Sequence, residues 1–220
     1  EVGGFGSNPG NLRMWLYAPS NIVSKPGLVI ALHGCSQNAT SYAYDTEWNN
    51  RASTAGKFYV VYPEQKSSNN FQLCFTWFTK TFQQRNYKEN ASIAQMIDYM
   101  VASYDVDPNK VYITGFSAGA CMSSVMLATY PEKFAGASLI AGIGYGEAVD
   151  VASAGLLMKN GKGTNSPEDW GNLFKTGYPA YSGSYNHKIL IFQGNLDAIV
   201  VPQNAEDLEE AWGNLKGLYS

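Results

Sequence analysis

Apolar runs alternate along the chain with stretches of mixed polarity, which is the pattern of strands alternating with helices. Four apolar runs lie at residues 28–32, 58–62, 111–114 and 189–192, and residues 12–17 alternate in character. A continuous apolar run indicates a strand that is buried on both faces. We therefore expect an α/β fold with a mostly parallel central sheet and helices on both faces. We expect the run at 58–62 to be closed by Pro63.

Helices are predicted where apolar residues recur at helical spacing. One such stripe consists of Ile93, Met96, Ile97, Met100 and Val101, and another of Leu208, Ala211, Trp212 and Leu215. A third helix is expected over residues 118–130, because Pro131 stops it. Residues 143–186 are rich in Gly, Ser, Asn and Pro and show weak periodicity. We expect short helices there that form part of the binding face.

The composition limits the classes of function. The chain is 45% hydrophobic and 15% charged, so it can fill a sizeable core. Its net charge is −3, and it has no basic run of the kind that nucleic-acid binders carry. Apolar runs stay well below the ~20 residues of a membrane span. We expect one catalytic domain over residues 1–220, with no nucleic-acid and no membrane partner.

Residues 115–119 read Gly-Phe-Ser-Ala-Gly, which matches the G-x-S-x-G nucleophile elbow. In this elbow the serine occupies a strained turn between a strand and a helix, so its neighbours must be small. The pentapeptide alone is a weak signal, but a predicted strand precedes it and an apolar helix follows it. We therefore expect Ser117 to be a nucleophile, the alternative being a structural glycine turn.

An oxyanion hole is expected from two loops. In hydrolases of this architecture, one backbone N–H comes from the residue after the nucleophile, here Ala118, and another from the loop after an early strand. The sequence His33-Gly34-Cys35 follows the predicted strand 28–32, and we assign the second donor to Cys35. This fold orders its triad as Ser, Asp, His. We therefore expect His33 to shape the loop by hydrogen bonding rather than to act as the base.

Asp197 follows the last predicted strand, where the acid of a hydrolase triad sits. The alternative is a turn or helix-cap role before Pro202. His187 lies at the start of the same strand, so the strand's rise puts ~15–20 Å between the two residues. We expect His187 to be at the wrong edge of the sheet. The base and a final strand are then expected from a missing C-terminal segment or a second polypeptide.

Three cysteines, Cys35, Cys74 and Cys121, leave open one disulfide with one free thiol, or three free thiols. Two N-glycosylation sequons, at Asn38 and Asn90, matter only if a eukaryote secretes the protein.

A series of segments resembles one known family. They are Leu-His-Gly-Cys-Ser-Gln-Asn at 32–38, Tyr-Pro-Glu-Gln at 62–65, Leu-Cys-Phe-Thr-Trp-Phe at 73–78, the elbow at 115–119, Ala-Thr-Tyr-Pro at 128–131, Phe-Ala-Gly at 134–136, Ile-Ala-Gly-Ile-Gly-Tyr-Gly at 140–146, Ser-Pro-Glu-Asp-Trp-Gly at 166–171, and the segment of Asp197. In this order they resemble short-chain polyhydroxybutyrate depolymerases and the related feruloyl and acetylxylan esterases, over residues 5–218.

The resemblance implies an extracellular α/β-hydrolase fold and a Ser-Asp-His triad, with no metal and no cofactor. It places Ser117 and Asp197 in the triad, with the histidine in a Gly-His-x-x-Pro segment beyond Asp197 that this chain lacks. It also implies a disulfide between Cys35 and Cys74, which leaves Cys121 free.

Two classes of function remain. The first is a serine carboxylic-ester hydrolase that acts on extracellular polyester or plant cell-wall esters. Our first choice within it is a polyhydroxybutyrate depolymerase-like enzyme, with feruloyl or acetylxylan esterase as the alternative. The second is a catalytically inactive hydrolase fold that binds polymer or carbohydrate, suggested by the absent base. Trp77, Tyr145 and Trp170 are expected substrate contacts, with plain packing as the alternative.

Overall fold

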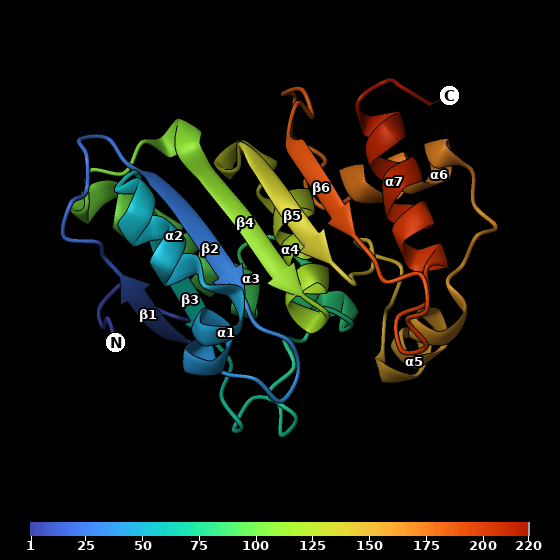
Figure 1. The fold of residues 1–220 in the computed structure, drawn as a ribbon. Coiled ribbons are helices and arrows are strands. Elements are labelled where there is room, and N and C mark those ends of the chain that lie inside the picture. The colour runs from blue at the N-terminus through green and yellow to red at the C-terminus, as the bar shows by residue number, and fades with distance from the viewer. Residues whose placement is uncertain (220) are drawn as a thin grey trace.

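The computed structural model describes residues 1–219, and its centre is a six-stranded sheet (Figure 1). The spatial order is β1-β3-β2-β4-β5-β6, and only β1 runs antiparallel to its neighbour. The strands are β1 (Arg13–Tyr17), β2 (Gly27–Leu32), β3 (Phe58–Glu64), β4 (Val111–Phe116), β5 (Gly136–Ile140) and β6 (Lys188–Phe192). The mostly parallel sheet predicted from the apolar runs is therefore confirmed.

Two details of the strands differ from the prediction. Pro63 does not close β3, which continues to Glu64. The pairing of β3 with β2 already ends at Val61, so the missing N–H of Pro63 interrupts no bond on that side. Strand β5 was not predicted, because its sequence Gly-Ala-Ser-Leu-Ile carries small residues and no continuous apolar run.

Helices lie on both faces of the sheet at β2, as predicted. Along β2, Leu28, Ile30 and Leu32 pack into the core beneath α3 (Lys88–Ser103) and α4 (Ala118–Thr129). The alternate residues of β2 pack instead with α1 (Ala39–Thr46) and α2 (Trp48–Ala55). Successive side chains of a strand point to opposite faces. A strand that is apolar throughout can therefore serve both layers.

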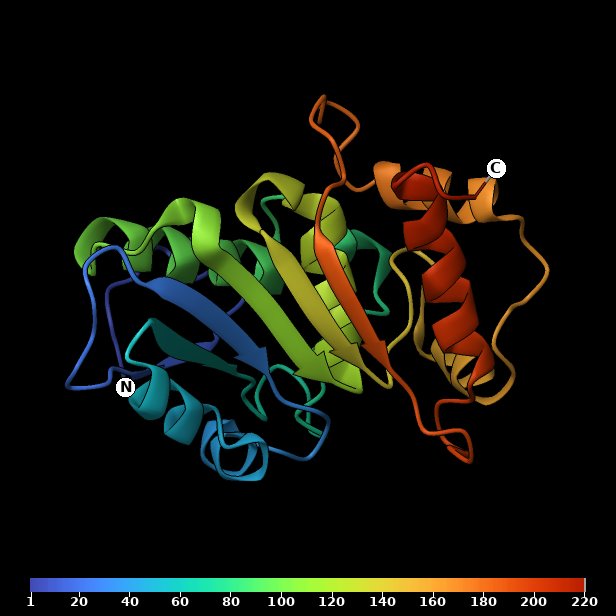
Figure 2. The same ribbon diagram turned by 45° about the horizontal axis from the view of Figure 1, so that its top comes forward.

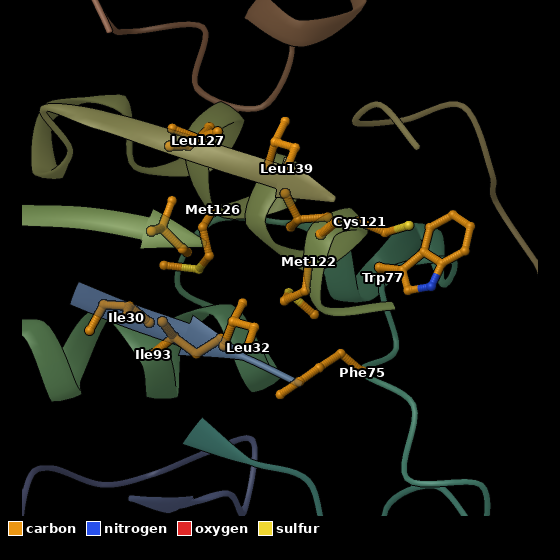
Figure 3. Packing of buried hydrophobic residues seen from close by; sticks show 14 of the residues in the cluster. Ile30, Leu32, Phe75, Trp77, Ile93, Cys121, Met122, Met126, Leu127 and Leu139 are labelled. Carbon is orange, nitrogen blue, oxygen red and sulfur yellow. The ribbon is translucent and has the colours of Figure 1, made fainter. Parts of the chain in front are cut away.

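Helix α4 is buried along its whole length. An apolar helix with no polar side is what such a position requires. Figure 3 shows Met122 and Met126 of α4 on the side of β2, and Cys121 on the side of Trp77. This central helix begins directly after Ser117, so the core supports the residue on which the predicted chemistry depends.

The chain after β5 forms a cluster of short helices beside β6 (Figures 1 and 2). These helices are α5 (Val151–Asn160), α6 (Pro167–Lys175) and α7 (Gln203–Leu215). The expectation of short helices within residues 143–186 is confirmed. Aromatic rings join α6 to α7, with the centroids of Phe174 and Trp212 5.2 Å apart. Short 3-10 turns occupy η1 (Lys80–Gln83), η2 (Pro108–Lys110) and η3 (Pro131–Lys133).

One face of the sheet is open over β4, β5 and β6 in the described part of the chain. Phe116, Ile140 and Phe192 are register partners, so they share that face. Phe116 is 41% exposed and Phe192 53% exposed. Strand β6 is the outermost strand at this end of the sheet. Among residues 1–219, each helix is too short or too polar to cross a lipid bilayer.

Candidate active site

The elbow at Ser117 has the strained backbone that the motif requires. Ser117 has φ 53° and ψ −119°, between the end of β4 and the first residue of α4. A non-glycine residue at such angles costs about 1–3 kcal/mol and persists only where its surroundings hold it. The Ser117 amide donates to the carbonyl of Ile140 at 2.9 Å, and the Ser117 carbonyl accepts from the amide of Cys121 at 3.0 Å. The side chain of Ser117 is partly exposed.

Neither glycine of the elbow has room for a side chain, because each lies against another segment of backbone. A Cβ added at Gly115 would lie closer than 3.0 Å to the backbone of Gly119. A Cβ added at Gly119 would meet the carbonyl groups of Leu32 and His33 at similarly short range. The first contact brings strand and helix together, as the spacing predicts. The second brings the helix against the loop that follows β2.

Two backbone amides near Ser117 form no hydrogen bond. Among the hydrogen bonds formed within residues 1–219, none uses the amide of Cys35 or of Ala118. Ala118 is the first residue of α4, where an N–H has no partner inside the helix. Gly34, next to Cys35, is close enough to Phe116 that an added Cβ would contact both its ring and its carbonyl. The loop and the elbow are thus in contact.

A disulfide joins Cys35 to Cys74, with their Cα atoms 4.2 Å apart, so the pairing implied by the resemblance is confirmed. The amide of Ser36 also donates to the carbonyl of Gln72 at 2.7 Å. The loop that carries Cys35 is therefore tied to the segment before Cys74 by one covalent and one hydrogen bond. Cys121 is free and buried, and burial raises the pKa of its thiol.

His33 shapes the loop that carries Cys35, as predicted. Its Nδ1 donates to the carbonyl of Gly34 at 2.7 Å, because its Nε2 accepts from the amide of Gln65 at 3.1 Å. Burial lowers the pKa of His33, which keeps the ring neutral in this arrangement. Both ring nitrogens are occupied, so His33 has no free nitrogen for Ser117.

A buried polar network continues from Gln65 and was missed by the sequence analysis. The side-chain amide of Gln65 donates to the carbonyl of Cys74 at 3.1 Å and to the carboxylate of Glu89 at 2.6 Å. Glu89 also accepts from the amide and the hydroxyl of Thr76, each at 2.8 Å. From sequence, Glu89 resembles any acidic residue in the first turn of a helix. Only its burial identifies it as an anchor of the Cys74 segment.

Asp197 lies beyond β6 and has a fixed orientation. Its Oδ1 accepts from the amides of Ile199 and Val200 at 2.9 and 3.0 Å, and its Oδ2 accepts from the side-chain amide of Gln193 at 3.3 Å. Desolvation raises the pKa of Asp197, but these hydrogen bonds outweigh it and hold the pKa below its usual value. The carboxylate is therefore ionised at neutral pH. The turn role left open by the sequence is present, and it also orients the group.

The sheet brings Ser117 and Asp197 to the same edge. They follow the carboxyl ends of β4 and β6, which are separated by β5 alone. Adjacent strands are about 4.8 Å apart, so about 10 Å separates the axes of β4 and β6. His187 lies before β6, at the other end of that strand, and its Nε2 donates to the carbonyl of Pro131 at 2.8 Å. The prediction that His187 is at the wrong edge is confirmed.

The three expected substrate contacts lie in the core. Trp77, Tyr145 and Trp170 are 5%, 9% and 2% exposed, and each belongs to the main hydrophobic cluster. The structure does not support the expected role, because large rings at these positions are covered by other side chains. Packing, the alternative reading, accounts for all three. Within residues 1–219, no group of three or more His, Cys, Asp and Glu side chains is placed to hold a metal ion.

Comparisons with known proteins agree with this geometry. The chain is 44% identical to poly(3-hydroxyalkanoate) depolymerase C of Paucimonas lemoignei over 99% of its own length and 52% of that protein. It is 34% identical to acetylxylan esterase A of Aspergillus oryzae, over 99% of this chain and 71% of that one. The chain thus spans about half the length of the first of these curated relatives.

Similar solved structures identify the fold. Acetyl xylan esterase from Aspergillus awamori matches with a TM-score of 0.90 and 32% identity, over 98% of this chain and 79% of that one. A thermostable esterase matches with a TM-score of 0.61 at 20% identity, which supports the fold alone. The fold is that of the α/β-hydrolase esterases. The family model described as "Esterase PHB depolymerase" matches residues 12–220. The chain belongs to the PHB depolymerase esterase family.

Proposed function

We propose that the protein is a secreted serine esterase that hydrolyses carboxylic esters of a polymer by two-step acyl transfer, and that residues 1–220 belong to one catalytic domain. The observation that carries this proposal is the strained, partly exposed Ser117, whose neighbours Phe116 and Gly119 lie against the loop in which the Cys35 amide forms no hydrogen bond. The disulfide supports export to an oxidising compartment. The relatives named above support either polyester or acetylated xylan as the polymer.

In the first step the Oγ of Ser117 attacks the ester carbonyl carbon. The carbonyl oxygen becomes an oxyanion that accepts hydrogen bonds from the amides of Cys35 and Ala118. Each donor of this kind contributes about 10²–10³ in rate. The C–O bond to the alcohol then breaks, and the alcohol leaves with a proton. In the second step water attacks the acyl-enzyme and releases the acid and the free Ser117.

The proton must be carried by a base that bridges Ser117 and Asp197. His33 and His187 are both engaged elsewhere. We therefore assign this role to a histidine outside these 220 residues, from a further segment of the polypeptide or a second polypeptide. The carboxylate of Asp197, ionised and already oriented, would hold the imidazole in one tautomer and stabilise its charge.

The test uses the full encoded protein and p-nitrophenyl butyrate. Ser117→Ala should lower kcat/KM by about 10⁴-fold or more. Ser103→Ala, at an exposed serine that ends α3, is the matched control and should leave the rate unchanged. A fluorophosphonate should modify Ser117, as read by peptide mass spectrometry. Absence of both turnover and labelling in the unsubstituted protein would instead favour an inactive hydrolase fold that binds polymer.

A further inference from the structure

A long groove runs along helix α1. Two hollows, of about 760 and 850 Å³, share Thr40, Tyr44 and Asp45 in their walls, so they adjoin each other along α1. We call these two adjoining hollows the α1 groove. It does not include Ser117 or Asp197, and nothing in the mechanism above uses it.

The α1 groove begins beside the proposed oxyanion loop. The hollow of about 850 Å³ is lined by Glu64 at the carboxyl end of β3 and by Leu73, the residue before the half-cystine Cys74. The amide of Ala39, which opens α1, donates to Glu64 at 2.9 Å and so holds this end of the helix at the edge where Ser117 lies. The groove ends at Trp15 on the outer strand β1. Figure 1 shows α1 close to β1 and β3. The groove therefore leads away from the site of chemistry.

Tyr44 is the ring at the centre of the α1 groove. Its side chain lines both hollows and is 85% exposed, although a tyrosine is usually at least half covered. Trp15 and Tyr17, both half-buried, line the hollow of about 760 Å³, whereas Tyr62 in the same wall is buried and offers no stacking face. A sugar ring has an apolar C–H face and a rim of hydroxyl groups, so it stacks on an aromatic side chain and hydrogen-bonds at its edge. A row of rings along a groove suits a chain of such units.

The polar lining favours a polysaccharide over a polyester. Asp45 and Glu47 are exposed in the groove and make no ion pair with any residue of 1–219. An ionised carboxylate only accepts hydrogen bonds. The Oδ2 of Asp45 accepts from the side-chain amide of Gln37 at 3.2 Å, whereas the carboxylate of Glu47 accepts no hydrogen bond within residues 1–219. A polyhydroxyalkanoate chain carries ester carbonyls, which also only accept, so it would leave Glu47 and the second oxygen of Asp45 without a partner. That arrangement is unfavourable. Sugar hydroxyls donate, and Asn49 and Asn50 add both donors and acceptors.

We propose that the α1 groove binds the backbone of an ester-bearing polysaccharide and holds the sugar units that flank the one presented to Ser117. This inference rests on the proposed esterase function, which it deepens by naming the substrate class. Tyr44 is the central stacking platform, and Asp45 and Glu47 accept hydrogen bonds from the sugar hydroxyls.

The test measures binding rather than turnover. The full encoded protein carrying Ser117→Ala is titrated calorimetrically with unesterified xylohexaose, cellohexaose and mannohexaose. At least one should bind, and Tyr44→Ala should weaken its Kd by about tenfold through loss of the stacking surface. Tyr44→Phe keeps the ring and should stay within about threefold. Phe71→Ala is the matched control, because Phe71 is also 85% exposed but lies outside the groove lining, and it should leave Kd unchanged.

Three results would overturn the inference: no binding of any of the three oligosaccharides, an equal loss from Tyr44→Ala and Phe71→Ala, or binding to polyhydroxybutyrate granules that Tyr44→Ala abolishes while the sugars do not bind. Hydrolysis of p-nitrophenyl butyrate by the unsubstituted protein is measured separately. Its absence would count against the proposed function, whereas its presence without sugar binding would count against the groove alone.

Discussion

Replacing Gly119 by alanine tests whether the proposed oxyanion loop, which carries Cys35, is positioned by direct contact with helix α4. The added Cβ would lie 2.7 Å from the carbonyl oxygen of His33 and 2.6 Å from the carbonyl carbon of Leu32, against 3.4 Å or more for an ordinary contact. Both neighbours are backbone atoms, so no side chain can rotate away. The carbonyl oxygen of Leu32 lies closer still, so the helix and the loop must separate by more than about 0.7 Å.

That separation has two consequences. Overpacking of this kind costs about 1–3 kcal/mol of the free energy of unfolding. It also moves the Cys35 amide relative to Ser117, and an oxyanion donor works only near 2.7–3.1 Å from the developing charge. Loss of one donor lowers kcat by about 10²–10³, so we expect kcat/KM for p-nitrophenyl butyrate to fall about 100-fold.

The assay pairs this rate with a thermal melt of the same protein. Gly155→Ala is the control, because Gly155 also lies in a helix, α5, and an added Cβ there has nothing within 4 Å. That substitution should raise stability by about 0.5–1 kcal/mol and leave the rate unchanged. If Gly119→Ala lowered Tm but kept kcat/KM within threefold, the loop would not act through this contact.

Three further predictions follow from buried or exposed groups. Burial raises the pKa of Glu147 from 4.5 to about 8, so the folded state binds a proton that the unfolded state has released, and stability should fall by about 1.4 kcal/mol per pH unit between these values. Glu147→Gln should remove most of that slope in thermal melts, and an unchanged slope would contradict it. The Cys35–Cys74 disulfide closes a sequence separation of 39, so its reduction should cost about 4 kcal/mol of stability, read from melts with and without reductant, and slow ester hydrolysis. Leu190 and Phe192 are 58% and 53% exposed on the outermost strand β6, so a 220-residue product should self-associate. Leu190→Lys should reduce this association in light scattering, and a monomer at all concentrations before substitution would refute it.

Some features of the protein could be read from short stretches of sequence because the cause is local. A strand buried on both faces needs an apolar residue at every position, so β2 is visible as a run. The elbow needs small residues on both sides of a strained serine, and Gly115 and Gly119 supply them within five positions. The contacts of His33 cannot be judged in this way, because its partner Gln65 lies 32 residues further along the chain. The order of the triad nevertheless indicated a structural role for His33.

Other features depend on what lies beside a residue in space. Strand β5 contains few large apolar residues and is held by β4 and β6 on either side. Helices α1 and α2 bury only a few side chains, among them Tyr42 and Ala52, which is too little to show as a stripe. Trp77 and Trp170 differ from exposed tryptophans only through the side chains that cover them.

The candidate site also has some features with a local cause and others that depend on contacts in space. The sequence by itself determined the nucleophile motif, the position of Asp197 after a predicted strand and the position of His187 before the same strand. Spacing along a chain decides which edge of a parallel sheet such a residue reaches. Only the tertiary structure decided that Glu89 anchors the Cys74 segment and that Tyr44 stands in a groove. Both facts are relations between side chains on different elements, and packing, not local propensity, brings such elements together.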